Sequence, residues 1–115
     1  ETAPDVVIIA TGGLAKSDGL RFGNDLAVTA WDVISGDIHP TGAVLVYDNV
    51  GDHSGLQACE NLARAGVQVE LMTPDRQIAG DVMATNLTPY MRALQPRGVT
   101  FTVGHRLEGI SQTKY

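Results

Sequence analysis

The chain has 115 residues, 43% of them hydrophobic, a composition typical of one globular domain rather than a disordered segment. Its 13 acidic residues outnumber 8 basic ones and give a net charge of −5, which disfavours nucleic acids and anionic membranes as partners. The longest apolar run, Val6–Ala10, is too short to span a membrane. The single cysteine excludes an internal disulfide and favours a reducing, cytoplasmic location.

The first forty residues predict one strand and one short helix. Residues 5–10, DVVIIA, form a β-branched apolar run typical of a buried parallel strand, which ends at TGG, residues 11–13. Residues 14–27 are polar and interrupted by glycines, so we expect a surface connection there. Thr29 and Asp32 have the spacing of a capping box and predict a helix over residues 29–35.

From residue 43 onward, predicted strands and helices alternate. We expect strands at 43–47, 67–72, 99–103 and 106–110, and helices that begin at Ser54 and within 84–95. Ser54 and Gln57 form a second capping box, while Thr88-Pro89 offers a later start for the last helix. This order predicts an α/β fold, a Rossmann-like doubly wound parallel sheet. Both ends look cut, so we expect a truncated domain.

The segment VYDNVGDHSG, residues 46–55, joins a strand to a helix where dinucleotide-binding proteins have G-x-G-x-x-G. Gly55 aligns with the third glycine, and Asp52 takes the place of the second. A carboxylate facing a phosphate at ~4 Å costs about 4 kcal/mol at an effective dielectric of ~20. The helix N-terminus offers an anion only ~1 kcal/mol. The sequence therefore argues against a pyrophosphate here, although Gly51 could shift the loop register and partly restore the site.

Asp75 and Arg76 follow the next predicted strand, with Asp75 20 residues beyond Gly55. That spacing fits an acid that binds a ribose hydroxyl, and the arginine could contact a 2′-phosphate or stack on adenine. An Asp-Arg pair after a strand is also ordinary turn chemistry, so both interpretations stay open.

Other reactive side chains fit structural roles. His53 has no partners at metal-ligand spacing and is expected to be solvated, while Cys59 lies on the apolar face of its helix. We expect the methionines, Met72, Met83 and Met91, in or near the core. No catalytic residue is predicted.

Two stretches of sequence resemble a known family. DVVIIATGG, residues 5–13, resembles the strand and turn that close the FAD-type domain of flavin-dependent disulfide reductases. AVLVYDNVGDHSGLQACENLARAGVQVELMTPDR and TNLTPYMRALQPRGVTF resemble the NAD(P)H-type domain of multidomain flavoproteins related to old yellow enzyme. This branch includes trimethylamine and dimethylamine dehydrogenases, 2,4-dienoyl-CoA reductase and N-demethylases of methylated amino acids. The resemblance implies a division into residues 1–41, the end of an FAD/ADP-type domain, and 42–115, the first part of an NAD(P)H-binding-like domain.

The resemblance also implies cofactors that lie outside this chain. The family has an FMN-binding barrel and a 4Fe-4S cluster, and in the amine dehydrogenases ADP or an FAD moiety is bound by the neighbouring domain. The chain is then a non-catalytic part of an oxidoreductase whose partner is the remainder of the parent chain. The candidate cofactor-binding residues are Thr11, Gly12, Gly13, Gly51, Asp52, Ser54, Gly55, Asp75 and Arg76.

Two alternative functions and one assembly prediction remain. The domain could still bind NAD(P)H and feed electrons to the flavin, or it could be a stand-alone, flavodoxin- or receiver-like partner-binding module. Because a truncated sheet exposes a strand edge, we also expect a homo-oligomer or a marginally stable chain.

Overall fold

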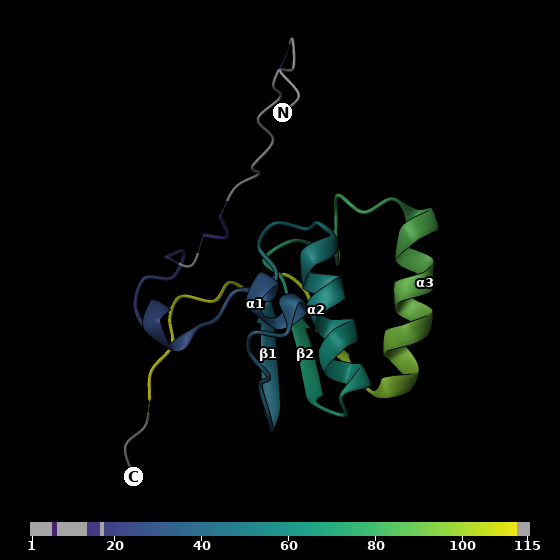
Figure 1. Ribbon diagram of the computed structural model, residues 1–115. Helices are drawn as coiled ribbons and strands as arrows, with labels where there is room; N and C mark the ends of the chain where they lie inside the picture. The colour runs from purple at the N-terminus through teal and green to yellow at the C-terminus, as the bar shows by residue number, and fades with distance from the viewer. Residues whose placement is uncertain (1–5, 7–13, 17, 113–115) are drawn as a thin grey trace.

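The computed structural model describes residue 6, residues 14–16 and residues 18–112, and shows a three-stranded parallel sheet with helices (Figure 1). The strands, in the order β1-β2-β3, are β1 (Ala43–Tyr47), β2 (Gln68–Met72) and β3 (Thr100–Thr102). The helices are η1 (Asn24–Leu26), α1 (Ala30–Ser35), α2 (His53–Arg64), α3 (Ala84–Leu94) and η2 (Gln95–Arg97). The Rossmann-like α/β prediction is confirmed, and the expected strand at residues 5–10 falls almost wholly outside the described residues.

Helix α1 has the capping box that its sequence predicts. The Asp32 backbone N–H donates to the Thr29 hydroxyl oxygen at 3.2 Å, and the Thr29 N–H donates to the Asp32 carboxylate at 3.0 Å. Gly36 ends the helix with φ +84°, a conformation that glycine adopts at little cost. These caps matter because a helix of six residues has few internal hydrogen bonds of its own.

Helix α2 starts earlier than expected. Its N-cap is Asp52, whose carboxylate accepts the Ser54 backbone N–H at 2.7 Å, so the prediction that Ser54 caps the helix is wrong. Gly51, at φ +82°, turns the chain one residue before the cap and places Asp52 at the helix end. The apolar face of α2 is buried as expected, with Leu56 and Cys59 fully enclosed.

Helix α3 begins at Ala84 and contains Pro89, so the later start that Thr88-Pro89 offered is wrong. Proline lacks the N–H that would reach the carbonyl of residue 85, but the Thr88 hydroxyl donates to the Ala84 carbonyl at 3.0 Å. The helix packs against α2, and Leu94 at its C-terminal end is fully buried.

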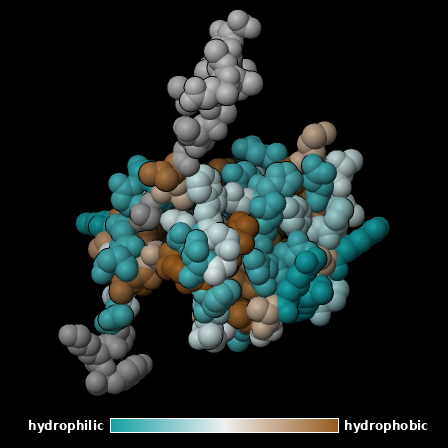
Figure 2. All heavy atoms as spheres, in the orientation of Figure 1, coloured by the Kyte–Doolittle hydropathy of each residue, from teal (hydrophilic) through white to brown (hydrophobic). Residues whose placement is uncertain are grey.

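The hydrophobic core lies between the sheet and α2 and α3, which cover the same face. Side chains alternate along β1, so Val44 and Val46 pack against the core while Leu45 points away and is 42% exposed. The opposite face is apolar at β1 and polar at β2 and β3, where the Thr102 hydroxyl donates to Glu70. In Figure 2 the surface over α3 is mostly hydrophilic, and hydrophobic residues are concentrated nearer α1.

Two sequence-based expectations fail outside the core. The predicted strand at 106–110 is absent, and that segment forms one parallel bridge between Phe22 and Gly109. A Cβ on Gly109 would stand 2.7 Å from the Phe22 ring, so the two segments meet side chain against backbone and a regular ladder does not continue. Met83 is 71% exposed because it is the N-cap of α3, so the expectation that it lies in or near the core is wrong. None of the described helices is long and apolar enough to cross a bilayer.

Candidate functional site

The carboxyl ends of the three strands meet at one edge of the sheet. The Asp48 N–H donates to the Met72 carbonyl at 2.8 Å, and the Thr73 N–H donates to the Thr102 carbonyl at 2.9 Å. These bonds extend the sheet by one residue past β1 and β2. In open α/β sheets ligands bind in the crevice beyond this edge, so the turns that follow the strands form the candidate site.

Asp48 stabilises the turn after β1 by accepting hydrogen bonds from backbone N–H groups of that turn. Its side chain is only 5% exposed, and its Oδ1 accepts the backbone N–H groups of Val50 at 3.1 Å and Gly51 at 2.8 Å. Its Oδ2 is buried and has no hydrogen-bond partner among the described residues. Aspartate side chains commonly accept a hydrogen bond from the backbone N–H two residues further along the chain. The position of Asp48 directly after a predicted strand could therefore have indicated this turn, and the sequence-based prediction missed it.

Asp52 occupies the N-terminus of α2 in the same way, since its carboxylate accepts the Ser54 N–H at 2.7 Å. Together, the carboxylates of Asp48 and Asp52 accept hydrogen bonds from three backbone N–H groups. In a dinucleotide-binding site, the N–H groups of this turn and helix end bind a phosphate instead. Both carboxylates also repel an anion. The residues present therefore do not fit a pyrophosphate bound at this turn in the usual position.

The two glycines of the turn are needed for packing within the protein. A Cβ on Gly55 would stand 3.0 Å from the Asp48 Cγ, so the missing side chain lets α2 lie against the end of β1. A Cβ on Gly51 would stand 3.2 Å from the Gly80 nitrogen, and the Gly51 carbonyl accepts the Asp81 N–H at 3.0 Å. The loop that follows β2 thus packs directly onto the turn that follows β1.

The structure brings some predicted site residues together and separates others. Asp75 lies beside the turn, with its Oδ2 3.8 Å from the point where a Gly51 Cβ would stand. Arg76 is exposed and lines neither of the two cavities at this edge of the sheet. The predicted turn residues Thr11, Gly12 and Gly13 lie outside the described residues.

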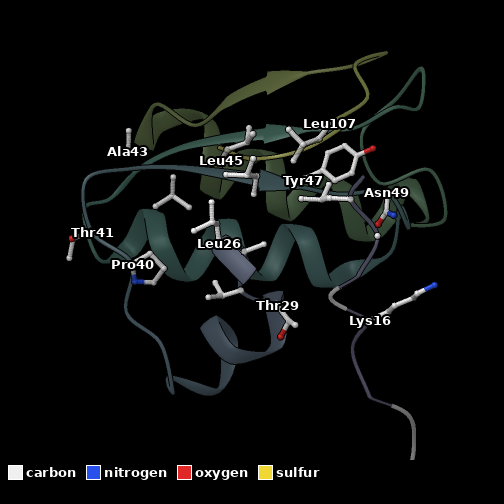
Figure 3. Close-up of a pocket in the computed structure, with 16 residues that line it drawn as sticks. Lys16, Leu26, Thr29, Pro40, Thr41, Ala43, Leu45, Tyr47, Asn49 and Leu107 are labelled. Carbon is white, nitrogen blue, oxygen red and sulfur yellow. The ribbon is translucent and has the colours of Figure 1, made fainter. Parts of the chain in front are cut away.

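Two adjoining cavities form the crevice at this edge. The larger, of 630 Å³, is apolar and lies against the open face of β1, where Leu45, Tyr47 and Leu107 line its wall (Figure 3). The second, of 490 Å³, is polar and lies beyond the ends of β1 and β2. Both cavities are lined by Tyr47 and Asn49, which makes them limbs of one crevice.

Two side chains of α2, Cys59 and His53, belong to residue types that often react or bind metals. Burial, with a smaller contribution from the Asp48 charge, raises the pKa of the Cys59 thiol to about 12, so the thiol is protonated at neutral pH. His53 is exposed, as expected, and its ring lies 5.9 Å from that of Tyr90. Within the described part of the chain, no three His, Cys, Asp or Glu side chains are placed to hold a metal ion.

Curated relatives identify the family. The chain is 59% identical over 111 residues to a probable N-methylproline demethylase of Rhizobium meliloti, and 33% identical over 106 residues to an N,N-dimethylglycine/sarcosine dehydrogenase of Chromohalobacter salexigens. It is 38% identical over 71 residues to a multifunctional alkene reductase/demethylase of Caballeronia cordobensis. The chain belongs to this flavoprotein family. No family model matches it.

The chain corresponds to a small part of these flavoproteins. The alignments cover 96% and 86% of the chain but only 16% and 15% of the first two relatives. Two solved structures share the fold. A 2-naphthoyl-CoA reductase has a TM-score of 0.75 and 21% sequence identity, and the match covers 95% of this chain and 16% of the reductase. A 6-hydroxypseudooxynicotine amine oxidase from Pseudomonas geniculata N1 has a TM-score of 0.63 and 22% identity, and the match covers 82% of this chain and 14% of the oxidase.

Proposed function

We propose that this chain is a structural, nucleotide-binding-like part of a flavoprotein that oxidatively demethylates N-methylated amino acids. The observation that carries the proposal is the filled turn, in which Asp48 and Asp52 satisfy the amides that a pyrophosphate would need. The 59% identity to a probable N-methylproline demethylase supports the substrate class. In this proposal the chain supplies no catalytic residue.

The remainder of the parent chain holds the reacting cofactors in this proposal. FMN, a 4Fe-4S cluster and ADP or an FAD moiety are assigned to that remainder, and the single cysteine supports a cytoplasmic location for the protein. The division at residues 41 and 42 also remains a proposal. Val33 of α1 shares the core with Leu56 of α2, which favours placing α1 with the second part.

A titration of the full-length protein with NADH and NADPH tests the filled turn. We expect no binding to the wild type at this turn, and no gain in Asp52→Gly beyond that in Asp37→Gly, an exposed aspartate remote from the turn. A saturable NAD(P)H site that tightens only in Asp52→Gly would show that the turn still forms a dinucleotide site. That result would overturn the structural assignment.

The reaction is tested separately on the full-length protein. N-methylproline and sarcosine are incubated with an artificial electron acceptor, and the formaldehyde released from the N-methyl group is measured. Formaldehyde release with bleaching of the flavin absorbance supports the demethylase assignment. Turnover of neither compound would count against this substrate class while leaving the assignment of the turn intact.

A second candidate function is that NAD(P)H bound at this domain reduces the flavin. The position of Asp75 beside Gly51 favours it, because an acid after the second strand is where a ribose hydroxyl binds in such domains. Anaerobic mixing with NADH or NADPH distinguishes the two functions. Rapid flavin reduction that Asp75→Ala slows would support this alternative.

A further inference from the structure

Two arginines flank the bridge between Phe22 and Gly109, and the predicted nucleotide motif leaves them without a role. Arg21 lies in the segment before η1 and Arg106 in the segment after β3, and both line the 490 Å³ cavity. Both side chains are exposed, and neither guanidinium group forms an ion pair within the described part of the chain. What these arginines bind therefore has to be inferred from their surroundings.

Two acidic residues line the same cavity without pairing with these arginines. Asp75 and Glu108 contribute to the cavity wall, but the Asp75 Oδ2 lies 3.8 Å from the point where a Gly51 Cβ would stand, at the turn after β1. Among the residues that the structure describes, neither acid forms an ion pair with Arg21 or Arg106. Both guanidinium groups therefore keep their planar sets of N–H donors for carboxylates from outside the unit, a pairing for which arginine is well suited.

Backbone hydrogen bonds fix the backbone of both arginines at one place on the surface. The Arg21 N–H donates to the Glu108 carbonyl at 2.8 Å, and the His105 N–H donates to the Thr73 carbonyl at 3.0 Å. The first bond joins the two segments, and the second fixes the residue before Arg106 to the end of β2. The backbone beneath the arginines is thus ordered before a partner binds, which lowers the entropic cost of association.

An apolar surface adjoins the arginines on the open face of β1. Leu26 and Leu45 are 39% and 42% exposed there, and both line the 630 Å³ cavity together with Leu107 (Figure 3). Leu107 also lines the polar cavity, so the apolar surface continues to the arginines. Parallel sheets are almost always covered on both faces, whereas α2 and α3 cover only one face of this sheet. The open face is therefore expected to have a protein partner.

The position of this surface favours the remainder of the parent protein as that partner. The chain spans only 16% and 15% of the first two curated relatives, so most of a parent flavoprotein lies outside it. The chain continues toward that remainder on both sides of the bridge between Phe22 and Gly109, which lies beside the arginines. Contacts between domains of one chain are part polar and part apolar, which matches two arginines beside an apolar cavity.

We propose that Arg21 and Arg106, together with the apolar surface at Leu26, Leu45 and Leu107, form one docking surface for the remainder of the parent flavoprotein. Carboxylates of that remainder pair with the two arginines, and its apolar side chains enter the 630 Å³ cavity. The inference rests on the proposed place of this chain in a longer flavoprotein, but it requires neither demethylase activity nor a nucleotide at the turn after β1.

Carbodiimide cross-linking of the full-length protein tests the ion pairs. The reagent joins a lysine amine to a carboxylate in direct contact, so Arg21→Lys and Arg106→Lys each place a reactive amine at the docking surface and keep the positive charge. We expect peptide mass spectrometry to find cross-links from both positions to carboxylates outside residues 1–115. Arg92→Lys, at an exposed arginine of α3, is the matched control and should give no such cross-link. Cross-links that stay within residues 1–115, in the same molecule or a second copy, or none at all, would overturn the proposal.

Arginine modification of the wild-type full-length protein tests the burial of the same surface without a substitution. We expect phenylglyoxal to modify Arg21 and Arg106 roughly tenfold more slowly than Arg92, because an interface that costs ~1.4 kcal/mol to open already gives this factor. Added ADP or inorganic phosphate should leave these rates unchanged. Rates equal to that of Arg92, or protection that requires an added anion, would overturn the proposal. Neither measurement depends on turnover, so failure of the demethylase assignment leaves both results valid.

Discussion

Asp48 and Gly55 share one space beneath the first turn of α2, because a Cβ on Gly55 would stand 3.0 Å from the Asp48 Cγ and 3.1 Å from its Oδ2. Asp48 is only 5% exposed and has no room to withdraw without breaking its bonds to the turn. We expect Gly55→Ala to lower the free energy of unfolding by about 1–3 kcal/mol, the usual cost of overpacking. Denaturant unfolding measures this change.

The control for this prediction is a glycine with open space around it. A Cβ on Gly19 would meet no atom within 4 Å, so Gly19→Ala should have little effect. Combining Gly55→Ala with Asp48→Ala should cost less than the sum of the two single variants, because the smaller side chain removes the clash. Strict additivity in this double-mutant cycle would show that the two residues do not share the space.

Asp52 contributes stability as the N-cap of α2. Its carboxylate accepts the Ser54 N–H at 2.7 Å, and loss of such a cap costs about 0.5–2 kcal/mol. We expect Asp52→Ala to lower the melting temperature, while Asp52→Asn, which keeps an acceptor oxygen, stays close to the wild type. If the two variants melt together, the capping bond contributes nothing and charge alone explains the effect.

Cys59 should be unreactive in the folded protein. Its side chain is fully buried, and burial raises the pKa of the thiol to about 12. We expect iodoacetamide at pH 8 to label the protein only after denaturation. Labelling of the native protein at the rate of a free thiol would contradict the buried position.

The same raised pKa predicts a pH dependence of stability. Between pH 9 and about 12 the unfolded chain loses the thiol proton while the folded chain keeps it, so the free energy of unfolding falls as pH rises. The upper limit of this slope is about 1.4 kcal/mol per pH unit. Cys59→Ala should flatten that part of the curve, and an unchanged slope in the variant would assign the loss to other groups.

The isolated chain is predicted to self-associate. Leu45 is 42% exposed on the open face of β1, and β1 and β3 each have one unpaired edge among the described strands. We expect sedimentation velocity to show dimers or larger species at micromolar concentration, and Leu45→Glu to shift them toward monomer. Thr100→Glu, on the polar part of the same face, is the control, and a monodisperse wild-type monomer would contradict the prediction.

Patterns that depend on neighbouring residues predicted the fold well. The capping box at Thr29 and the apolar runs of β1 and β2 are local, and the structure contains these elements within one residue of the predicted bounds. The start of α2 was wrong because Asp52 and Ser54 are both good cap residues, and Gly51, at φ +82°, decides between them. That backbone choice depends on contacts with Gly80 and Asp81, which sequence spacing does not reveal.

The candidate site was less predictable because its parts are distant in sequence. Asp52 could be recognised from the glycine spacing, whereas the burial of Asp48 depends on α2 packing over the end of β1. Arg21 and Arg106, which both line the polar cavity, are separated by 85 positions, and backbone contacts such as the Phe22–Gly109 bridge bring their segments together. No periodicity or motif in the chain links these two residues.

The bridge between Phe22 and Gly109 joins two segments that are far apart in the sequence. It makes the segment before η1 and the segment after β3 neighbours, and the Arg21 N–H donates to the Glu108 carbonyl beside it. The sheet and its helices therefore form a closed excursion of the chain that leaves and returns at one place, the geometry in which a compact unit can be inserted or exchanged as one piece.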